Sequence, residues 1–168
     1  MRLIFGSDHR GQDLCRILRQ YLKVSNGTDV DYVESDGESI DYPDIAARVA
    51  TTICNGLADY GILICGTGIG MCIVANKFPG IRAVPCHSIV AAEFSRRFND
   101  ANVLCLSGDM LGELSGPQIV EKWLETPFEG GKHTKRLEKI REIEELGIKS
   151  ASVISTAAQQ KEKLLTVP

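Results

Sequence analysis

A cysteine precedes a glycine-rich loop near the middle of the chain. The apolar run Ile62-Leu63-Ile64 is typical of a buried strand, and Cys65 and Gly66-Thr67-Gly68-Ile69-Gly70 follow it. Residues 71–76 continue as the start of a helix. A strand, a glycine loop and a helix form an anion site, because backbone N–H groups converge on one point. The same N–H groups would favour the thiolate form of Cys65. The pattern predicts a base or nucleophile beside a developing oxyanion.

Other interpretations of this loop stay open. Cys65 could be a buried strand cysteine, and the glycines could simply allow a helix to pack closely on a strand. The loop is not a full dinucleotide fingerprint, and it lacks the lysine-serine pair of a phosphate-binding P-loop. A cysteine phosphatase would need an arginine at the position of Met71, so we set that activity aside. As an oxyanion hole, the loop needs N–H donors near the developing charge, and Thr67 adds a hydroxyl.

Asp8 and His9 follow the first apolar segment of the chain. As a pair they could bind a hydroxyl and a phosphate, or carry a proton. The alternative for Asp8 is the N-cap of the helix that follows, a common use of aspartate. Capping gives no account of His9.

A basic cluster follows the glycine pair at 130–131. Lys132, His133, Lys135 and Arg136 lie within five positions, and the rest of the chain is acidic. The cluster matches the charge of a phosphate group. The alternative is a solvated helix face, which is the common fate of such charge runs.

The elements that must position these residues alternate along the chain. Strand-like segments cover residues 2–5, 29–33, 61–65, 81–84 and 103–106, and helical spacing separates them. The pattern predicts an α/β three-layer sandwich with a five-stranded, parallel, Rossmann-like sheet. Ligands bind at the carboxyl ends of such strands. That edge would carry residues 7–9, 65–70, 86–87 and 107–108.

Length and composition agree with one domain over residues 1–149. A last helix over 132–146 could pack on its own subunit or on a partner, and the tail at 150–168 would be loosely held or would contact a partner. The net charge of −3 argues against nonspecific nucleic-acid binding, and no apolar run is long enough to span a membrane. The N-terminus turns polar early, and the six cysteines include no CxxC pair. These features favour reduced thiols in the cytoplasm. The cysteine spacing also predicts no metal site.

Seven ordered motifs extend over residues 1–146. They are Gly6-Ser7-Asp8-His9-Arg10-Gly11, Asp41-Tyr42-Pro43, Ile64 to Gly70, Ala75-Asn76-Lys77, Gly80-Ile81-Arg82-Ala83, Asn99-Asp100-Ala101-Asn102-Val103 and Glu129-Gly130-Gly131-Lys132-His133. Together they make the chain resemble the ribose-5-phosphate isomerase B family, whose relatives are the allose-6-phosphate and galactose-6-phosphate isomerases.

The resemblance implies an aldose–ketose isomerase of the non-oxidative pentose phosphate pathway, which interconverts ribose 5-phosphate and ribulose 5-phosphate. Cys65 would take the C2 proton and return it at C1, while Thr67 and the loop from Gly66 to Gly70 hold the enediolate. No cofactor and no metal are implied.

The resemblance also implies the substrate contacts. His9, Lys132 and Arg136 match phosphate-binding positions, with lysine at 132 where the family usually has arginine. Asp8 matches a contact to sugar hydroxyls, and Tyr42 lies in a matching motif and is included with the substrate-binding residues. Asn99 matches a residue that the partner subunit contributes, so a homodimer or tetramer with shared sites is expected.

One position departs from the family pattern. The family commonly has a ring-opening histidine where this chain has Phe98, and phenylalanine cannot transfer a proton. His87 or His9 could replace it, or ring opening could be left to solution. The departure keeps two alternatives open: an isomerase of a six-carbon sugar phosphate, and a noncatalytic sugar-phosphate-binding module.

Overall fold

The computed structural model describes residues 1–26, 30–33, 41–112 and 115–147. The chain divides into two compact units, Met1–Gly130 and Gly131–Pro168. The predicted tail at 150–168 lies outside the described residues.

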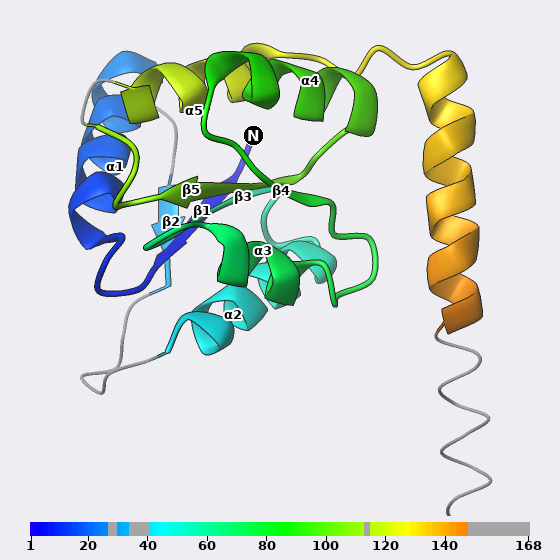
Figure 1. Cartoon of the computed structure of the whole chain (residues 1–168), viewed down its shortest axis with the longest axis horizontal. Helices are drawn as coiled ribbons and strands as arrows, with labels where there is room; N and C mark the ends of the chain where they lie inside the picture. Colours follow the sequence, from blue (N-terminus) through cyan, green and yellow to red (C-terminus); the bar gives the residue numbers. More distant parts are fainter. Residues whose placement is uncertain (27–29, 34–40, 113–114, 148–168) are drawn as a thin grey trace, which may run out of the picture. The chain divides into compact units, whose positions relative to one another are not determined.

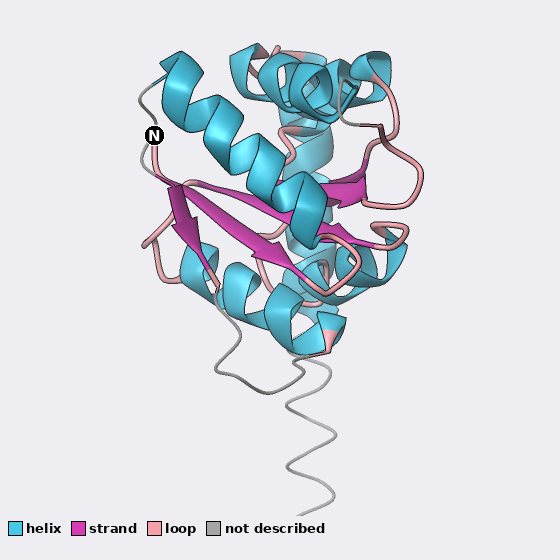
Figure 2. Cartoon of the chain, turned by 90° about the vertical axis from the view of Figure 1, so that its left-hand side faces the viewer, coloured by secondary structure: helices cyan, strands magenta, loops and turns pink. Residues whose placement is uncertain are grey.

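The first unit is built on one parallel sheet. Its strands are β1 (Leu3–Ser7), β2 (Val30–Tyr32), β3 (Tyr60–Cys65), β4 (Ala83–Pro85) and β5 (Val103–Ser107). They lie in the order β2-β1-β3-β5-β4, and every neighbouring pair is parallel (Figure 2, magenta). The predicted five-stranded parallel sheet is confirmed.

Helices cover both faces of this sheet (Figure 1). They are α1 (Gln12–Asn26), α2 (Tyr42–Cys54), α3 (Ile69–Ala75), α4 (Ile89–Asn99) and α5 (Ser115–Glu125). In Figure 1, α1, α4 and α5 lie on one face, and α2 and α3 lie on the other. Each face has its own apolar core. The predicted three-layer arrangement is therefore confirmed.

Strand alternation decides which core receives each side chain of β3. Ile62 and Ile64 pack into the core beneath α1, α4 and α5, whereas Leu63 and Cys65 pack into the core beneath α2 and α3. Successive side chains of a strand point to opposite faces, so this division follows from position alone. Cys65 therefore faces the layer formed by α2 and α3.

The helix starts follow local sequence signals. Asp41 accepts the N–H of Tyr42 at 2.8 Å, and Pro43 lies in the first turn of α2, where a missing N–H costs nothing. Ser88 caps α4 by accepting the N–H of Ala91 at 3.2 Å, as its position predicts. Gly116 and Pro117 lie in the first turn of α5, where proline is tolerated.

The second unit begins at a break in backbone direction. Gly130 and Gly131 have φ values of 71° and 57°, a left-handed conformation that favours glycine. A helix follows over 132–147. Its apolar residues Ile140, Ile143 and Leu146 are exposed. The single domain over 1–149 and the packing of this helix on a partner stay predictions. Among the described residues, no helix is long and apolar enough to cross a bilayer.

Candidate active site

The carboxyl ends of β1 and β3 meet at the point where the strand order reverses. Ser7 pairs with Ile64 in the sheet, and the N–H of Asp8 donates to the carbonyl of Ile64 at 3.2 Å. In a doubly wound sheet, ligands bind at such a switch point. The loop after β1 and the glycine loop after β3 are thus neighbours, as the edge predicted from the sequence requires.

Cys65 lies at the inner end of the glycine loop. Its side chain is 5 % exposed, and the N–H of Gly68 donates to Sγ at 3.1 Å. Gly68 has a φ of 76°, and a Cβ at this residue would lie 3.0 Å from the carbonyl oxygen of Leu106. Glycine is therefore needed at 68 for both conformation and space. The result is a sulfur atom held against a backbone donor.

The loop after β5 orients the peptide groups that follow Cys65. The Gly108 N–H donates to the carbonyl of Cys65 at 2.8 Å. The carbonyl of Gly66 accepts the Ser107 hydroxyl at 2.6 Å and the Asp109 N–H at 3.2 Å. In a trans peptide the C=O and N–H point in opposite directions. The N–H groups of Gly66 and of the residue after it therefore point away from β5, toward the side of β1.

Thr67 and Ile69, two further residues of the loop, are hydrogen-bonded to each other. The N–H of Ile69 donates to the hydroxyl oxygen of Thr67 at 3.3 Å, so this N–H already has an acceptor. Thr67 itself is exposed. Its hydroxyl is therefore within reach of solvent and of a bound molecule. The oxyanion donors best oriented by the structure are the N–H groups of Gly66 and Thr67, rather than that of Ile69.

Asp8 is almost buried, and it holds the turn after β1. Its Oδ1 accepts the N–H groups of Arg10 at 2.9 Å and of Gly11 at 3.1 Å. Because α1 begins only at Gln12, Asp8 caps this turn and not the helix, which corrects the N-cap interpretation. His9 is exposed beside it. Both residues follow β1 at the carboxyl edge of the sheet, where β1 pairs with β3.

Tyr42 lies beside the same loop. A Cβ at Gly70 would come within 2.7 Å of the Tyr42 ring, so the ring packs directly on this glycine. The first residue of α2 is thereby brought to the glycine loop, although residue 42 is far from it in sequence. The structure thus gathers Cys65, Thr67, Asp8 and Tyr42, with His9 next to Asp8.

The remaining predicted residues are not gathered with Cys65 in the first unit. Asn99 is the last residue of α4, and β5 begins shortly after it at Val103. Asn99 therefore lies at the amino edge of the sheet, separated from the carboxyl edge by about 16 Å, the length of a five-residue strand. Lys132 and Arg136 lie one turn apart on the helix of the second unit, and their role in phosphate binding stays a prediction.

His87 follows β4 at the carboxyl edge and is exposed. Strand β5 lies between β4 and β3, so His87 is about 10 Å away across the sheet, two strand spacings from the end of β3. His9 follows β1, which is next to β3. Of the two histidines considered as substitutes in ring opening, His9 is the nearer to Cys65.

Sequence reasoning missed two charged residues at this edge. The guanidinium of Arg10 lies over Gly66 and pairs with Asp109, the second residue after β5. Their places directly after two strand ends were a signal available in the sequence. The spacing could not show that the arginine bends back over the glycine loop. In contrast, Arg96 is a core residue, since it is buried and donates to Asp100 and to the carbonyl of Ala101 at 2.7 Å each.

The other buried thiols are held in their neutral form. Burial raises the pKa of Cys15 and of Cys86 to about 11, and burial raises the pKa of Cys105 as well. A hydrogen bond from Cys105 lowers the pKa of Cys72, which is half-buried. No group of three or more potential metal ligands occurs among the residues that the structure describes.

The fold and the site define an α/β protein with a cysteine at the switch point of its sheet. A family model described as Ribose/Galactose Isomerase matches residues 3–140, and the chain belongs to this family. It is 43 % identical over 145 residues to ribose-5-phosphate isomerase B of Escherichia coli, covering 86 % of this chain and 97 % of the relative. It is 40 % identical over 141 residues to D-erythrulose-4-phosphate isomerase of Pectobacterium atrosepticum, covering 83 % and 93 %.

Solved structures agree with these relatives. The ribose-5-phosphate isomerase B of Clostridium thermocellum superposes with a TM-score of 0.82 at 44 % identity, over 86 % of this chain and 98 % of that one. The enzyme of Mycoplasma genitalium with bound ribulose-5-phosphate gives 0.79 at 37 % identity, over 86 % and 96 %. The predicted family, fold and isomerase class are confirmed.

Proposed function

We propose that this chain interconverts ribose 5-phosphate and ribulose 5-phosphate through an enediolate, with Cys65 as the base. The observation that carries the proposal is the place of its sulfur, at the β1/β3 switch point and 3.1 Å from the N–H of Gly68. Cys65 takes the proton from C2 of the open-chain aldose and returns it at C1 of the ketose. A proton also moves from O2 to O1, so the reaction needs no oxidant, reductant or added group.

The enediolate carries its negative charge on oxygen, and the loop offers donors for it. The N–H groups of Gly66 and Thr67 are aimed away from β5, toward the side of β1, because the β5 loop holds the carbonyls on their other side. Donors that are oriented before the reaction stabilise developing charge at no cost in reorganisation. Asp8 offers its second carboxylate oxygen to a sugar hydroxyl, since the turn after β1 uses only Oδ1.

The test is turnover of ribose 5-phosphate in D₂O, followed by NMR. A cysteine base exchanges its proton with solvent, so deuterium should enter at C1 of ribulose 5-phosphate and at C2 of ribose 5-phosphate. Cys65→Ala should abolish both signals. Binding without turnover by the wild type would instead support the noncatalytic module.

A second substrate is favoured by Phe98. Its ring stacks on Phe94 with centroids 5.0 Å apart, and the Arg97 guanidinium lies 5.2 Å from the ring, so this position offers no proton-transfer group. A tetrose 4-phosphate carries its phosphate on the hydroxyl that would close a five-membered ring, so it needs no ring opening. D-erythrulose 4-phosphate is therefore the second candidate. Its kcat/KM should be compared with those of ribose, allose and galactose phosphates, the last two representing the six-carbon alternative.

We further propose a homodimer whose two sites share residues. Asn99 lies at the opposite edge of the sheet from the Cys65 of its own chain, so it can act at a site only in another copy. Apolar side chains are exposed on two helices near the edge strand β4: Ile69 and Ile73 on α3, and Ile89, Val90 and Phe94 on α4. Exposed apolar residues in such number are typical of an interface. A tetramer would bring two such dimers together, and sedimentation would separate the two states.

Subunit mixing tests the shared site. Cys65→Ala and Asn99→Ala should each be inactive as purified proteins. In a mixed dimer, one site combines both defects and the other has neither. Unfolding and refolding the two variants together in equal amounts should therefore restore about a quarter of the wild-type activity under random pairing. A mixture that stays inactive, with the mixed dimer verified, would place Asn99 outside the site.

We also propose the cytoplasm as the compartment. Cys15, Cys65, Cys72, Cys86 and Cys105 carry free thiols in the structure, and reduced thiols are typical of cytosolic proteins. Fractionation of cells that make the protein, with activity measured in each fraction, tests the compartment directly.

A further inference from the structure

The loops after β1, β3 and β5 meet at the side chain of Arg10, at the carboxyl edge of the sheet. The guanidinium of Arg10 lies so close to Gly66 that a Cβ at this glycine would be 2.8 Å from its Cζ and 2.9 Å from Nε and Nη1. The Nη2 atom of Arg10 donates to the carboxylate of Asp109. The backbone N–H of Asp109 in turn donates to the carbonyl of Gly66 at 3.2 Å. The side chain of Arg10 is thus held on the residue next to Cys65.

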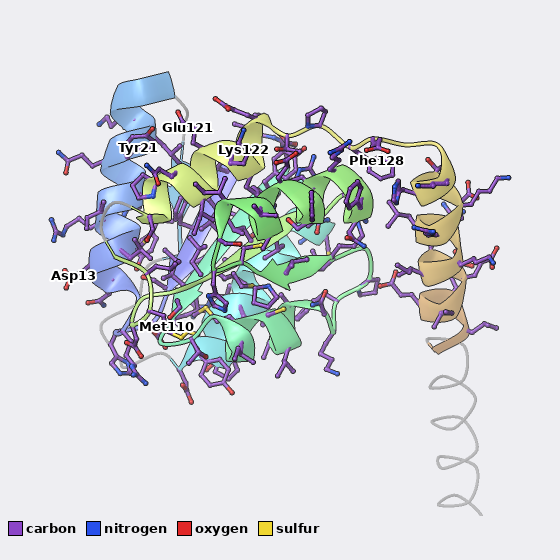
Figure 3. All side chains as sticks on the ribbon, turned by 45° about the horizontal axis from the view of Figure 1, so that its top comes forward. Asp13, Tyr21, Met110, Glu121, Lys122 and Phe128 are labelled. Atoms are coloured by element: carbon purple, nitrogen blue, oxygen red, sulfur yellow. The ribbon has the colours of Figure 1, made fainter. Side chains whose placement is uncertain are left out.

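The backbone of Arg10 is fixed from two more directions. Its N–H donates to Asp8 at 2.9 Å, and Gly108 packs so closely on its carbonyl that a side chain at 108 would collide with it. Met110, the residue after Asp109, has an exposed side chain (labelled in Figure 3), so the loop that carries Asp109 lies at the surface of the protein. The position of the guanidinium is therefore set by backbone contacts and one ion pair, before any ligand binds.

Most of the donors of this guanidinium remain available. An arginine has five N–H donors in a planar fork, and in the described part of the chain Asp109 is the one acceptor, reached through Nη2. The side chain of Arg10 is 56 % exposed and that of Asp109 is 36 % exposed. An ion pair this exposed contributes little to folding. Its geometry instead leaves Nε and Nη1 free to meet an anion above Gly66.

We propose that Arg10 binds the phosphate of the substrate, with Asp109 as the residue that positions it. The proposal rests on the proposed function, since it takes a sugar phosphate as the ligand. A guanidinium matches a phosphate with parallel hydrogen bonds, and His9 next to it adds a further donor. The phosphate and the reacting carbons then lie at the same switch point of the sheet, with Arg10 against Gly66 and Cys65 directly before it in the chain. Arg10 belongs to the first unit, whereas Lys132 and Arg136 belong to the second.

Four variants test the assignment. Arg10→Ala should raise KM for ribose 5-phosphate about tenfold to a hundredfold, the usual effect of losing a charge-assisted contact, while kcat changes far less. Arg10→Lys should recover part of this loss because it keeps the charge without the fork. Arg16→Ala is the matched control, since it also removes an exposed arginine paired with an aspartate, at 3.3 Å on α1, and its KM should equal that of the wild type.

The double variant Arg10→Ala with Asp109→Ala separates two causes. If KM rises only because an unpaired Asp109 repels the phosphate, the double variant regains the wild-type KM. The proposal predicts that KM stays raised. It is overturned by recovery in the double variant, or by a KM of Arg10→Ala within twofold of the wild type. Circular dichroism of every variant verifies the fold, and Arg10→Lys carries the comparison if the alanine variant does not fold.

Calorimetric titration with inorganic phosphate tests Arg10 without any turnover. Wild-type protein and Arg16→Ala should bind phosphate with equal affinity, and Arg10→Ala should bind it at least about tenfold more weakly. If the wild type binds phosphate in this pattern but does not isomerise ribose 5-phosphate, the proposed function fails and the anion site stands. Equal affinity in Arg10→Ala, or no phosphate binding by the wild type, overturns the role of Arg10.

Discussion

Replacing Cys65 by serine distinguishes the role of this residue in catalysis from its role in the stability of the fold. The Sγ atom accepts the Gly68 N–H at 3.1 Å and is packed in the core beneath α2 and α3. A serine hydroxyl is slightly smaller and accepts the same N–H. We therefore expect the free energy of unfolding of Cys65→Ser to stay within about 1 kcal/mol of the wild type, the scale of one neutral hydrogen bond.

The effect on catalysis should be much larger. A serine hydroxyl is a far weaker base than a thiolate at neutral pH, so the variant loses the base contribution of about 10²- to 10⁴-fold in kcat. This loss corresponds to about 3 to 5 kcal/mol of activation free energy. Cys65→Ala should lose the same activity but should also be less stable than the serine variant by about 1 kcal/mol, because the Gly68 N–H then has no acceptor.

The assay is formation of ribulose 5-phosphate, together with solvent deuterium exchange at C2, which reports proton removal itself. Cys86→Ser is the matched control, since Cys86 is fully buried, follows β4 and packs into the opposite core. It should keep its kcat. A Cys65→Ser enzyme that exchanges the C2 proton within tenfold of the wild-type rate would refute the assignment of the base, whatever its stability.

Three further outcomes follow from particular contacts. Gly70→Ala should displace the Tyr42 ring, which a Cβ would approach within 2.7 Å, and should raise KM about two- to tenfold with little change in melting temperature; an unchanged KM would remove Tyr42 from the substrate contacts. Arg96→Met should lower the free energy of unfolding in urea by about 3 kcal/mol, because the buried carbonyl of Ala101 loses its donor and Asp100 loses one of its two arginine partners; a loss below the error of the measurement would contradict this. Burial raises the pKa of the Cys15 thiol from 9.0 to about 11 in the folded protein. The contribution of this thiol to the stability of the fold is therefore complete below pH 9 and is lost as pH rises to 11. Between pH 9 and pH 11 the free energy of unfolding of Cys15→Ala should therefore fall by on the order of 2 kcal/mol less than that of the wild type. Parallel curves of the two proteins in alkaline denaturation would exclude this thiol as the cause.

Much of the fold could be predicted because its signals are local. The apolar runs that became β1, β3 and β5 are short, buried on both faces and bounded by polar or glycine residues, which is typical of central parallel strands. Ser88 was identifiable as a cap because its hydrogen bond reaches only three residues along the chain. The strand limits were predicted less closely: β1 covers Leu3–Ser7 rather than the predicted 2–5, and β4 covers Ala83–Pro85 rather than 81–84, since the ends of a strand depend on pairing with its neighbours.

The sequence by itself determined that a cysteine and a glycine loop follow a buried strand, and that the family motifs occur in order. Adjacency within the chain carries that information. Only the tertiary structure decided that Tyr42 packs on Gly70. The same is true of Arg10, which packs on Gly66 and forms an ion pair with Asp109. It also decided that Asn99 lies at the opposite edge of the sheet from Cys65. These relations join residues distant in sequence. They depend on the strand order β2-β1-β3-β5-β4 and on close backbone approach at glycines, which residue spacing does not encode.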